Sequence, residues 1–341
     1  MITSEADLRE VMPTPLSKVR LKILPKLERH SLRFIELASV LAISVASPTA
    51  VAPISLVLGR GRLKALDEST VVDDAPDAAL AQTWRTSAVA GQPLFVGALL
   101  LIPGIGETLR INGHLAPDQH GDRMVIVVDE VYLQCPKALV RSELWNPATW
   151  QRAAPEQPGA TDEAAMHAFI AAAPFALLAT AAASGHADLS PRGDPAGAFI
   201  RRVDAQTLLL PDRTGNHLVD SLRNIIANPR ATLAVLVPGA SYMLQISAQA
   251  SLTADTALLA ASALRGKAPK VGILLQIIEM RFVPLQPAML WNPSNLVDPA
   301  TLPTMGQMIL DQVNPGGKTI NKIGSALFDL GNSFHKKHRL Y

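Results

Sequence analysis

The feature that most constrains the fold of this chain is a repeat of its own sequence. Phe34-Ile35 recurs 135 positions later as Phe169-Ile170, and each pair ends a polar helical stretch that is followed by an apolar run of small residues. Pro103-Gly104, which closes the apolar stretch LLLIPG, recurs at the same distance as Pro238-Gly239 in LAVLVPG. Because the motifs recur in one order and at one spacing, the sequence predicts one supersecondary plan built twice in tandem.

A Trp-Asn-Pro triplet closes each copy. Trp145-Asn146-Pro147 recurs as Trp291-Asn292-Pro293, now 146 positions later. The longer spacing is explained by TADTALLAASALRGKAPK in the second copy, which we expect to be helical, and by a shorter stretch before Trp291. Each copy is predicted to hold a helix, two or three short strands, a second helix, the apolar strand with its Pro-Gly turn, two more strands and a terminal helix. Strands this short favour antiparallel pairing, so we expect a mainly β (α+β) fold, a small barrel with flanking helices, rather than a doubly wound parallel sheet.

The repeat also sets the expected domain boundaries. The four segments are a first copy (1–152), a linker rich in Pro, Gly, Ala and Gln (153–160), a second copy (161–296) and a helical C-terminal tail (297–341). In the tail we expect one helix near Met305 to Val313 and a more basic one from Lys318. A chain of 341 residues is long enough for two domains of ~150 residues, each with a sizeable core.

Composition excludes several classes of protein. The formal charge is only +2, from 31 Lys and Arg against 29 Asp and Glu, whereas a nucleic-acid binder would carry a strongly basic domain or stripe. The single cysteine, Cys135, excludes an intramolecular disulfide and suits a reducing compartment, so we expect a cytoplasmic protein without an export signal. The charge-free runs 37–59 and 86–106 are long enough to span a membrane, but prolines interrupt both. We therefore expect buried strands there, no membrane association and no metal site.

Three stretches carry a resemblance to a known family. The second copy contains ADLSPRGDPAGAFIRRVDAQTLLLPDRTGNHLVDSLRNIIANPR, and the first contains LIPGIGETLRINGHLA followed by VDEVYLQCPKALVRSELWNP. These stretches resemble the pyridoxamine 5'-phosphate oxidase-like family of FMN-binding split barrels, in its branch with an SPRGD segment and a KALxRSxLW segment, and the resemblance covers most of the chain. It implies two tandem split β-barrel domains with flanking helices, packed as an intramolecular pseudo-dimer in a monomeric chain. It also implies an FMN-dependent oxidoreductase that acts on an unidentified small molecule, with NADH or NADPH as an open option for the electron donor.

The resemblance implies a set of cofactor-binding residues that the two copies share unequally. In this family FMN usually lies between two subunits, one of which supplies a phosphate-binding part and the other a strand and a C-terminal segment. The phosphate-side motif is intact in the second copy, as Arg192, Gly193, Asp194, Asp212, Arg213, Gly215, Asn216 and Asn224. The partner-side motif is intact in the first copy, as Glu107, Thr108, Arg110, Lys137, Arg141, Ser142 and Trp145.

Each copy has lost the motif that the other keeps. Pro53-Ile54-Ser55-Leu56 of the first copy stands opposite Pro191-Arg192-Gly193-Asp194, so an Arg and an Asp are replaced by Ile and Leu. In the second copy, Gln245 stands opposite Arg110. A fused pseudo-dimer explains this complementary loss, because the two intact parts can meet in one complete site. We therefore expect one FMN per chain rather than two.

The proposed residues have physical roles that fit a buried phosphate, and each has a simpler alternative. A phosphate can be buried only among cationic or N–H donors, which Arg192, Arg213 and the turn 212–216 with the following helix start would supply. The same turn could be an ordinary connection in which Asp or Asn caps the helix. Lys137 and Arg141 share a helical face at i, i+4 spacing, and they either reach an anion or form a solvated face.

Two further residues and the reaction itself leave alternatives open. Arg110 alternates with apolar residues on a strand and could face solvent. Trp145 either covers the flavin ring or packs in the core, and packing is favoured because Trp291 repeats it at the incomplete position. No general acid or base can be named, so the catalytic residues are unknown. A non-catalytic flavin-, heme- or deazaflavin-binding protein and a structural pseudo-dimer without cofactor remain alternative functions.

Overall fold

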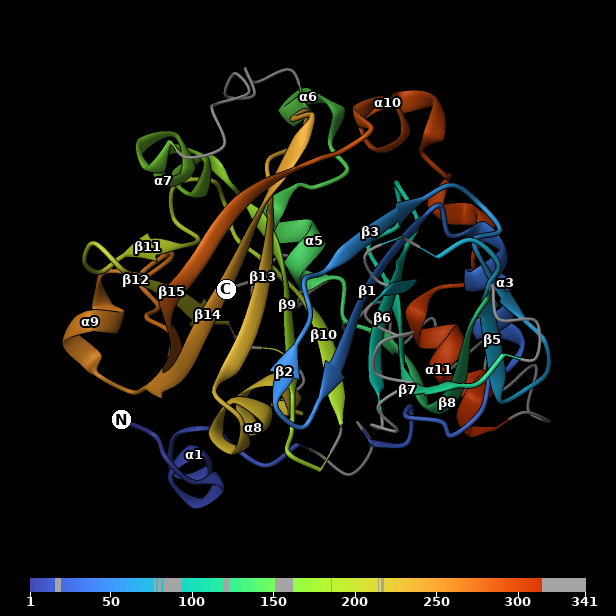
Figure 1. Ribbon diagram of the computed structural model, residues 1–341, viewed down its shortest axis with the longest axis horizontal. Helices are drawn as coiled ribbons and strands as arrows, with labels where there is room; N and C mark the ends of the chain where they lie inside the picture. Colours follow the sequence, from blue (N-terminus) through green and yellow to red (C-terminus); the bar gives the residue numbers. More distant parts are fainter. Residues whose placement is uncertain are drawn as a thin grey trace.

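Two antiparallel sheets lie side by side in the computed structural model of this protein (Figure 1). The structure describes residues 1–15, 20–76, 78, 81–82, 94–118, 123–150, 162–184, 186–213, 215 and 218–314. The expected linker 153–160 and the expected basic segment from Lys318 lie outside these residues. We call the residues up to 150 the N-terminal half and those from 162 the C-terminal half.

The first sheet belongs to the N-terminal half. Its strands follow the order β2-β1-β6-β7-β8-β5-β4, and β3 also pairs with β1. The strands are β1 (Val40–Ser47), β2 (Ala50–Val51), β3 (Ser55–Leu58), β4 (Leu63–Ala65), β5 (Thr70–Asp73), β6 (Phe95–Leu101), β7 (Thr108–Ala116) and β8 (Met124–Gln134). The run 37–59 is therefore occupied by strands separated by turns, as its prolines predict.

The second sheet repeats this arrangement in the C-terminal half. Its strands follow the order β10-β9-β13-β14-β15-β12-β11. They are β9 (Phe175–Ala181), β10 (Ala187–Gly193), β11 (Arg201–Arg202), β12 (Thr207–Asp212), β13 (Arg230–Leu236), β14 (Tyr242–Thr253) and β15 (Val271–Pro284). The fold is thus mainly β with antiparallel pairing, as expected, and the helix expected between β5 and β6 falls largely outside the described residues.

The register of the two sheets follows the spacing of the sequence repeat. Val40 pairs with Leu101 in the first sheet, and Phe175 pairs with Leu236 in the second, each 135 positions further along. A register shift interrupts β7 between Asn112 and Gly113, and β14 has the same irregularity between Ser247 and Ala248, again 135 positions later. The two sheets therefore share not only strand order but also pairing and the position of a bulge.

Strand pairing corrects one detail of the sequence alignment. Ser55 lies opposite Ile43 on β1, and Ser190 lies opposite Leu178 on β9, so these two serines are equivalent. The sequence alignment, which places Pro53 opposite Pro191, is three positions out of register. By strand pairing the place of Arg192 is taken by Val57, so the first copy still lacks the cation.

Short helices flank the sheets at their ends. They are α1 (Glu5–Val11), α3 (Arg29–Leu37), α5 (Lys137–Ser142), α6 (Pro147–Trp150), α7 (Glu163–Ala172), α8 (Asp220–Ala227), α9 (Thr256–Ala260), α10 (Pro287–Leu290) and α11 (Met305–Val313), with 3-10 turns at Pro293–Asn295 and Pro299–Thr301. The expected tail helix is confirmed as α11. The inserted segment of the second copy forms only the five residues of α9 as helix, because a turn closed by Leu264 and Lys267 follows it. No helix within the described ranges combines the length and apolar character needed to cross a membrane.

The repeated helices α3 and α7 show why the sequence pattern recurs. Each begins with a side-chain cap, from Glu28 in α3 and Asp162 in α7. Each helix also places a completely buried phenylalanine, Phe34 or Phe169, in the core beside its own sheet. Capping satisfies the free N–H groups of the first turn, and the buried aromatic ring anchors the helix against the strands.

Helices α1 and α11 each pack against the opposite half of the chain. Leu8 of α1 packs in the core of the second sheet, whereas Met308 of α11 packs in the core of the first. In Figure 1, α1 lies near α8, and α11 lies beside β7 and β8. Each half is therefore completed by a terminal helix that is distant in sequence.

The Pro-Gly turns receive segments from the opposite half. Gly104 and Gly239 both have φ +91°, a backbone conformation that glycine adopts without steric cost. A Cβ at Gly104 would collide with the backbone of Val297, and one at Gly239 with the backbone of Trp150. These reciprocal close contacts explain why the repeated turns keep glycine.

An apolar core joins the two sheets. Leu99 and Leu101 of β6 pack in one cluster with Leu177 of β9 and Leu189 of β10. Trp145 and Trp291, the repeated tryptophans, meet at the edge of this cluster with ring centroids 6.2 Å apart. Both tryptophans therefore serve packing between the halves.

Candidate functional site

A pocket of about 140 Å³ opens between the two halves. Strands β7 and β8 and helix α5 of the N-terminal half line it on one side, and β10, the end of β12 and the start of α8 line it on the other. We call it the interface pocket. Its walls combine arginines with apolar side chains that include Met12, Phe199 and Leu218.

Eight of the residues that the sequence singled out line this pocket. From the N-terminal half they are Arg110, Lys137 and Arg141, and from the C-terminal half Arg192, Gly193, Asp212, Arg213 and Gly215. The partner-side residues thus come from one copy and the phosphate-side residues from the other. This is the juxtaposition that the complementary loss of motifs predicts.

Six others do not reach the pocket lining. They are Glu107, Thr108, Ser142, Trp145, Asp194 and Asn224. Asn224 donates its amide to Thr180 Oγ1 at 3.2 Å, and Ser142 donates its hydroxyl to the carbonyl of Leu139 at 3.0 Å. The Asn224 amide and the Ser142 hydroxyl therefore form hydrogen bonds within the fold. Asn216 lies outside the described residues.

Arg192 and Asp212 form one wall of the pocket. They lie on β10 and at the end of β12, and their side chains form an ion pair. Neither of the two is fully exposed: the side chains retain 17% and 9% of their accessible surface. The Asp212 carboxylate thus pairs with Arg192 while part of the Arg192 side chain stays accessible.

A carboxylate behind the wall binds two more arginines. Asp194 is completely buried, and its Oδ2 accepts from Arg213 Nε at 2.6 Å. Its Oδ1 lies 2.9 Å from Nε of Arg141, which also donates to the carbonyl of Gly193 at 2.8 Å. Burial raises the pKa of Asp194, and the two guanidinium groups oppose that shift.

Two arginine nitrogens beside the interface pocket have no acceptor among the described residues. Arg213 Nη2 and Arg192 Nε are buried, and neither donates a hydrogen bond to any residue that the structure describes. Leaving a buried charged donor unsatisfied is costly, and native proteins do so rarely. Both side chains line the pocket, so a ligand with anionic oxygens there would meet two guanidinium groups whose donors the protein leaves partly unused.

The start of α8 adds a second feature suited to anions. Val219 precedes the helix with φ +57°, and no side chain caps the first turn. The ordinary Asp or Asn cap, which the sequence left open, is therefore absent at this helix. Val219 and Ser221 line the pocket, and an uncapped helix N-terminus favours negative charge through its free N–H groups and dipole.

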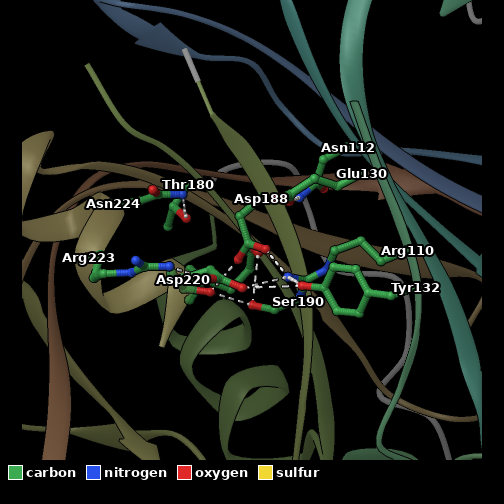
Figure 2. A network of polar contacts seen from close by, with 12 residues as sticks. Arg110, Asn112, Glu130, Tyr132, Thr180, Asp188, Ser190, Asp220, Arg223 and Asn224 are labelled. Atoms are coloured by element: carbon green, nitrogen blue, oxygen red, sulfur yellow. Dashed lines mark hydrogen bonds and ion pairs between the residues drawn. The ribbon is translucent and has the colours of Figure 1, made fainter. Parts of the chain in front are cut away.

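Arg110 anchors a polar network on the other side of the pocket (Figure 2). Its guanidinium forms an ion pair with Asp188 of β10 and donates to Tyr132 Oη at 2.6 Å. Tyr132 donates in turn to Asp220 Oδ2 at 3.2 Å. The solvent-facing alternative for Arg110 is wrong, because only 3% of the residue is exposed.

Two serines complete the network around Asp188. Ser221 donates to Asp188 Oδ2, and Ser190 and Ser221 lie 2.9 Å apart through their hydroxyl oxygens. Figure 2 shows Asp188 and Ser190 turned toward Arg110 and Tyr132 from the opposite strand. Burial raises the pKa of Asp188 and that of Tyr132, in both cases against the lowering effect of the Arg110 charge.

Sequence reasoning missed Tyr132, Asp188, Ser190 and Ser221. One signal was available for three positions of β10, because Asp188, Ser190 and Arg192 alternate along the strand and so share a face. Nothing in the sequence indicated that this face of β10 meets Arg110 of the other copy.

A buried lysine lies beneath the same network. Lys22 Nζ donates to the carbonyl of Leu133 at 2.9 Å and lies 5.4 Å from the centroid of the Tyr132 ring. Burial lowers its pKa to about 8, and Arg110 contributes to the lowering. Lys22 thus adds a titratable cation close to Arg110.

At the equivalent position in the other orientation, which we call the closed position, the amide of Gln245 is bonded to other groups of the chain. Gln245 pairs with Ala234 as Arg110 pairs with Leu99, so the two residues occupy corresponding places. Gln245 Nε2 donates to the carbonyl of Ile54 at 2.5 Å, and its Oε1 accepts from Arg281 Nη2 at 2.9 Å. The amide is thus bonded on both sides within the chain.

Comparisons with known proteins match part of the C-terminal half to one family model. Residues 162–283 match the sequence model of a family described as pyridoxamine 5'-phosphate oxidase. Among curated proteins no match is found.

Solved structures resemble about one third of the chain. HupZ of Group A Streptococcus is 17% identical over 33% of this chain and 86% of its own, with a TM-score of 0.28. An F420 reductase is 16% identical over 33% and 94%, with a TM-score of 0.26. HutZ, a heme storage protein from Vibrio cholerae, is 16% identical over 36% and 93%, with a TM-score of 0.26.

Proposed function

The match of residues 162–283 to the pyridoxamine 5'-phosphate oxidase family is the premise from which we propose that the whole chain binds one FMN in the interface pocket. The flavin would serve an oxidoreductase reaction on a small molecule. We also attribute the shared strand order to tandem duplication, with 1–152 and 161–296 as the two copies.

The observation that carries this proposal is a pair of arginine side chains at the pocket, each with one donor that the protein leaves unsatisfied. Arg213 Nη2 and Arg192 Nε are buried without an acceptor among the described residues, and the uncapped start of α8 lies in the same wall. A terminal phosphate offers several anionic oxygens to such donors. These residues therefore fit the phosphate of FMN.

The size of the pocket assigns it to one end of the ligand. Its volume of about 140 Å³ is smaller than the roughly 300–1,000 Å³ of pockets that enclose a whole ligand. We therefore assign the interface pocket to the phosphate end. FMN, when bound, supplies the hydride or electron transfer, and the protein supplies binding, orientation and electrostatics.

The chain's own residues would divide these tasks. Arg192 and Arg213 would bind the phosphate, held in place by Asp212 and Asp194 respectively. Arg110 would act differently, because its charge is already matched by Asp188, and it would support the pocket wall rather than contact the anion.

One site rather than two follows from the asymmetry between the halves. At the corresponding second position, Gln245 replaces Arg110 and bonds the carbonyl of Ile54, while Val57 replaces Arg192. That position therefore lacks both the arginine proposed to bind the phosphate, Arg192, and the arginine proposed to support the pocket wall, Arg110. We propose that the two halves of one monomeric chain take the place of the two subunits of a dimer.

An absorbance spectrum of the purified protein and a titration with FMN test the proposal. Arg192→Ala should weaken FMN binding roughly tenfold or more, because it removes a charged donor from the phosphate. Arg123→Ala is the matched control, since Arg123 pairs with the buried Asp118 at 2.8 Å and does not line the pocket. Equal losses in both variants, or no flavin binding by the unaltered protein, would contradict the proposal.

The reaction is tested separately from binding. Addition of NADH or NADPH to the FMN-loaded protein without oxygen should bleach the flavin absorbance if the chain is an oxidoreductase that uses these donors. Bound flavin that no electron donor reduces would favour the non-catalytic alternative. Only the first outcome supports the enzymatic part of the proposal.

A further inference from the structure

Asp194 lies where the two halves and the interface pocket meet. The residue follows β10 of the C-terminal half and is completely buried. Its two carboxylate oxygens face Arg213 Nε, at 2.6 Å, and Arg141 Nε, at 2.9 Å. Arg141 comes from α5 of the N-terminal half, so one carboxylate contacts an arginine from each half.

Arg213 bonds Asp194 through one nitrogen, keeps another without an acceptor among the described residues, and lines the pocket with its side chain. Its Nε bonds Asp194, whereas its Nη2 is buried without an acceptor among the described residues, and the side chain lines the pocket at 7% exposure. A guanidinium group is planar and its donors have fixed directions. The bond from Nε to Asp194 therefore determines where Nη2 points.

We propose that Asp194, which does not itself line the pocket, is a positioning residue for the anion site. It holds Arg213 so that the outer nitrogen faces the ligand. The proposal rests on the proposed function, because the ligand group it concerns is the phosphate of FMN or a similar anion.

The Asp194 carboxylate also links the orientation of Arg213 to the contact between the two halves. A Cβ at Gly193 would collide with the carbonyl oxygen of Ala138, so α5 lies directly against the end of β10. Asp194 fixes Arg141 of α5 and Arg213 of the anion site at once. A bound anion that engages Arg213 should therefore stabilise the assembled halves against unfolding.

Positioning and simple charge make opposite predictions for Asp194→Asn. If only charge mattered, removal of a carboxylate beside the site would strengthen the binding of an anion. If Asp194 positions Arg213, its loss leaves the guanidinium without its anchor and the binding of an anion weakens. The sign of the change in affinity distinguishes the two roles.

The experiment titrates FMN and, separately, inorganic phosphate into the unaltered protein, Asp194→Asn and the control Arg123→Ala. Flavin fluorescence and calorimetry give the dissociation constants, and circular dichroism checks the fold. We expect Asp194→Asn to raise both dissociation constants roughly tenfold, as for a lost hydrogen bond between charged groups. Unchanged or tighter binding by a folded Asp194→Asn would overturn the proposal.

A second variant decides the question if Asp194→Asn does not fold. Arg213→Lys keeps the positive charge, but its ammonium on a flexible stem lacks the planar set of donors that Asp194 can hold in one orientation. We expect the same roughly tenfold loss, and an affinity equal to that of the unaltered protein would overturn the positioning role. Failure of the unaltered protein to bind either probe would overturn the proposed function together with this inference.

Discussion

Arg110 on β7 and Asp188 on β10 form an ion pair that is buried between the two halves of the chain. The side chains retain 4% and 2% of their accessible surface, and Tyr132 bonds the same guanidinium. Each charge is therefore balanced by a residue that lies on the other sheet. The halves depend on each other electrostatically as well as through their shared apolar core.

Removing one member of this pair should cost more than removing both. Arg110→Met or Asp188→Leu alone leaves a buried charge without its partner, and we expect a loss of about 3–5 kcal/mol in the free energy of unfolding. The double variant should recover a large part of that loss. Urea unfolding of the three variants measures this coupling, and strictly additive losses would contradict the described pairing.

Arg110→Gln should also weaken FMN binding, although Arg110 is matched within the protein. The substitution copies the residue found at the closed position, and it leaves the Asp188 carboxylate uncompensated near the anion site. Gln245→Leu is the matched change at the closed position and should leave the FMN affinity unaltered. Fluorescence titration compares the two, and similar effects of both substitutions would be inconsistent with a single site.

Lys22 should make stability depend on pH in the alkaline range. Burial lowers its pKa from 10.5 to about 8, so between these values the unfolded chain binds a proton that the folded chain has released. The free energy of unfolding should therefore rise with pH across this window, by roughly 3 kcal/mol at most. Lys22→Met should remove that rise, and unfolding curves for both proteins at about pH 7 and about pH 10 measure it. Parallel pH dependences would show that Lys22 is not the group responsible.

The chain should be a monomer in solution. The site draws its partner-side and phosphate-side residues from two halves of one chain, so a second chain is not needed to complete it. Sedimentation equilibrium should give a mass near 36.3 kDa. A stable dimer whose dissociation releases the flavin would contradict this assignment.

The fold was predictable because its sequence pattern occurs twice in the chain, at a spacing of 135 positions. Phe34 and Phe169, and the two Pro-Gly turns, gave the spacing that the strand register then reproduces. The alignment of Pro53 with Pro191 was misleading because a shared proline says nothing about which strand residues pair. Hydrogen bonding between strands, which sequence spacing does not report, sets the true equivalence.

The site was predictable only in part, for a similar reason. Arginines that follow family motifs were found from the sequence, but the carboxylates that hold them were either unassigned, as Asp188, or given a direct role in binding, as Asp194. Ion pairs between distant segments depend on how the two sheets pack, and no local pattern encodes that. Asn224, which the resemblance assigns to cofactor binding, bonds Thr180 inside its own half, and motif membership does not report that contact.

The number of flavins bound per chain tests the central claim most directly. The protein is saturated with FMN and freed of excess ligand, and the flavin absorbance is then compared with the protein concentration from amino-acid analysis. The account predicts one FMN per chain, held in the pocket between the halves. Two FMN per chain, or none, would contradict it.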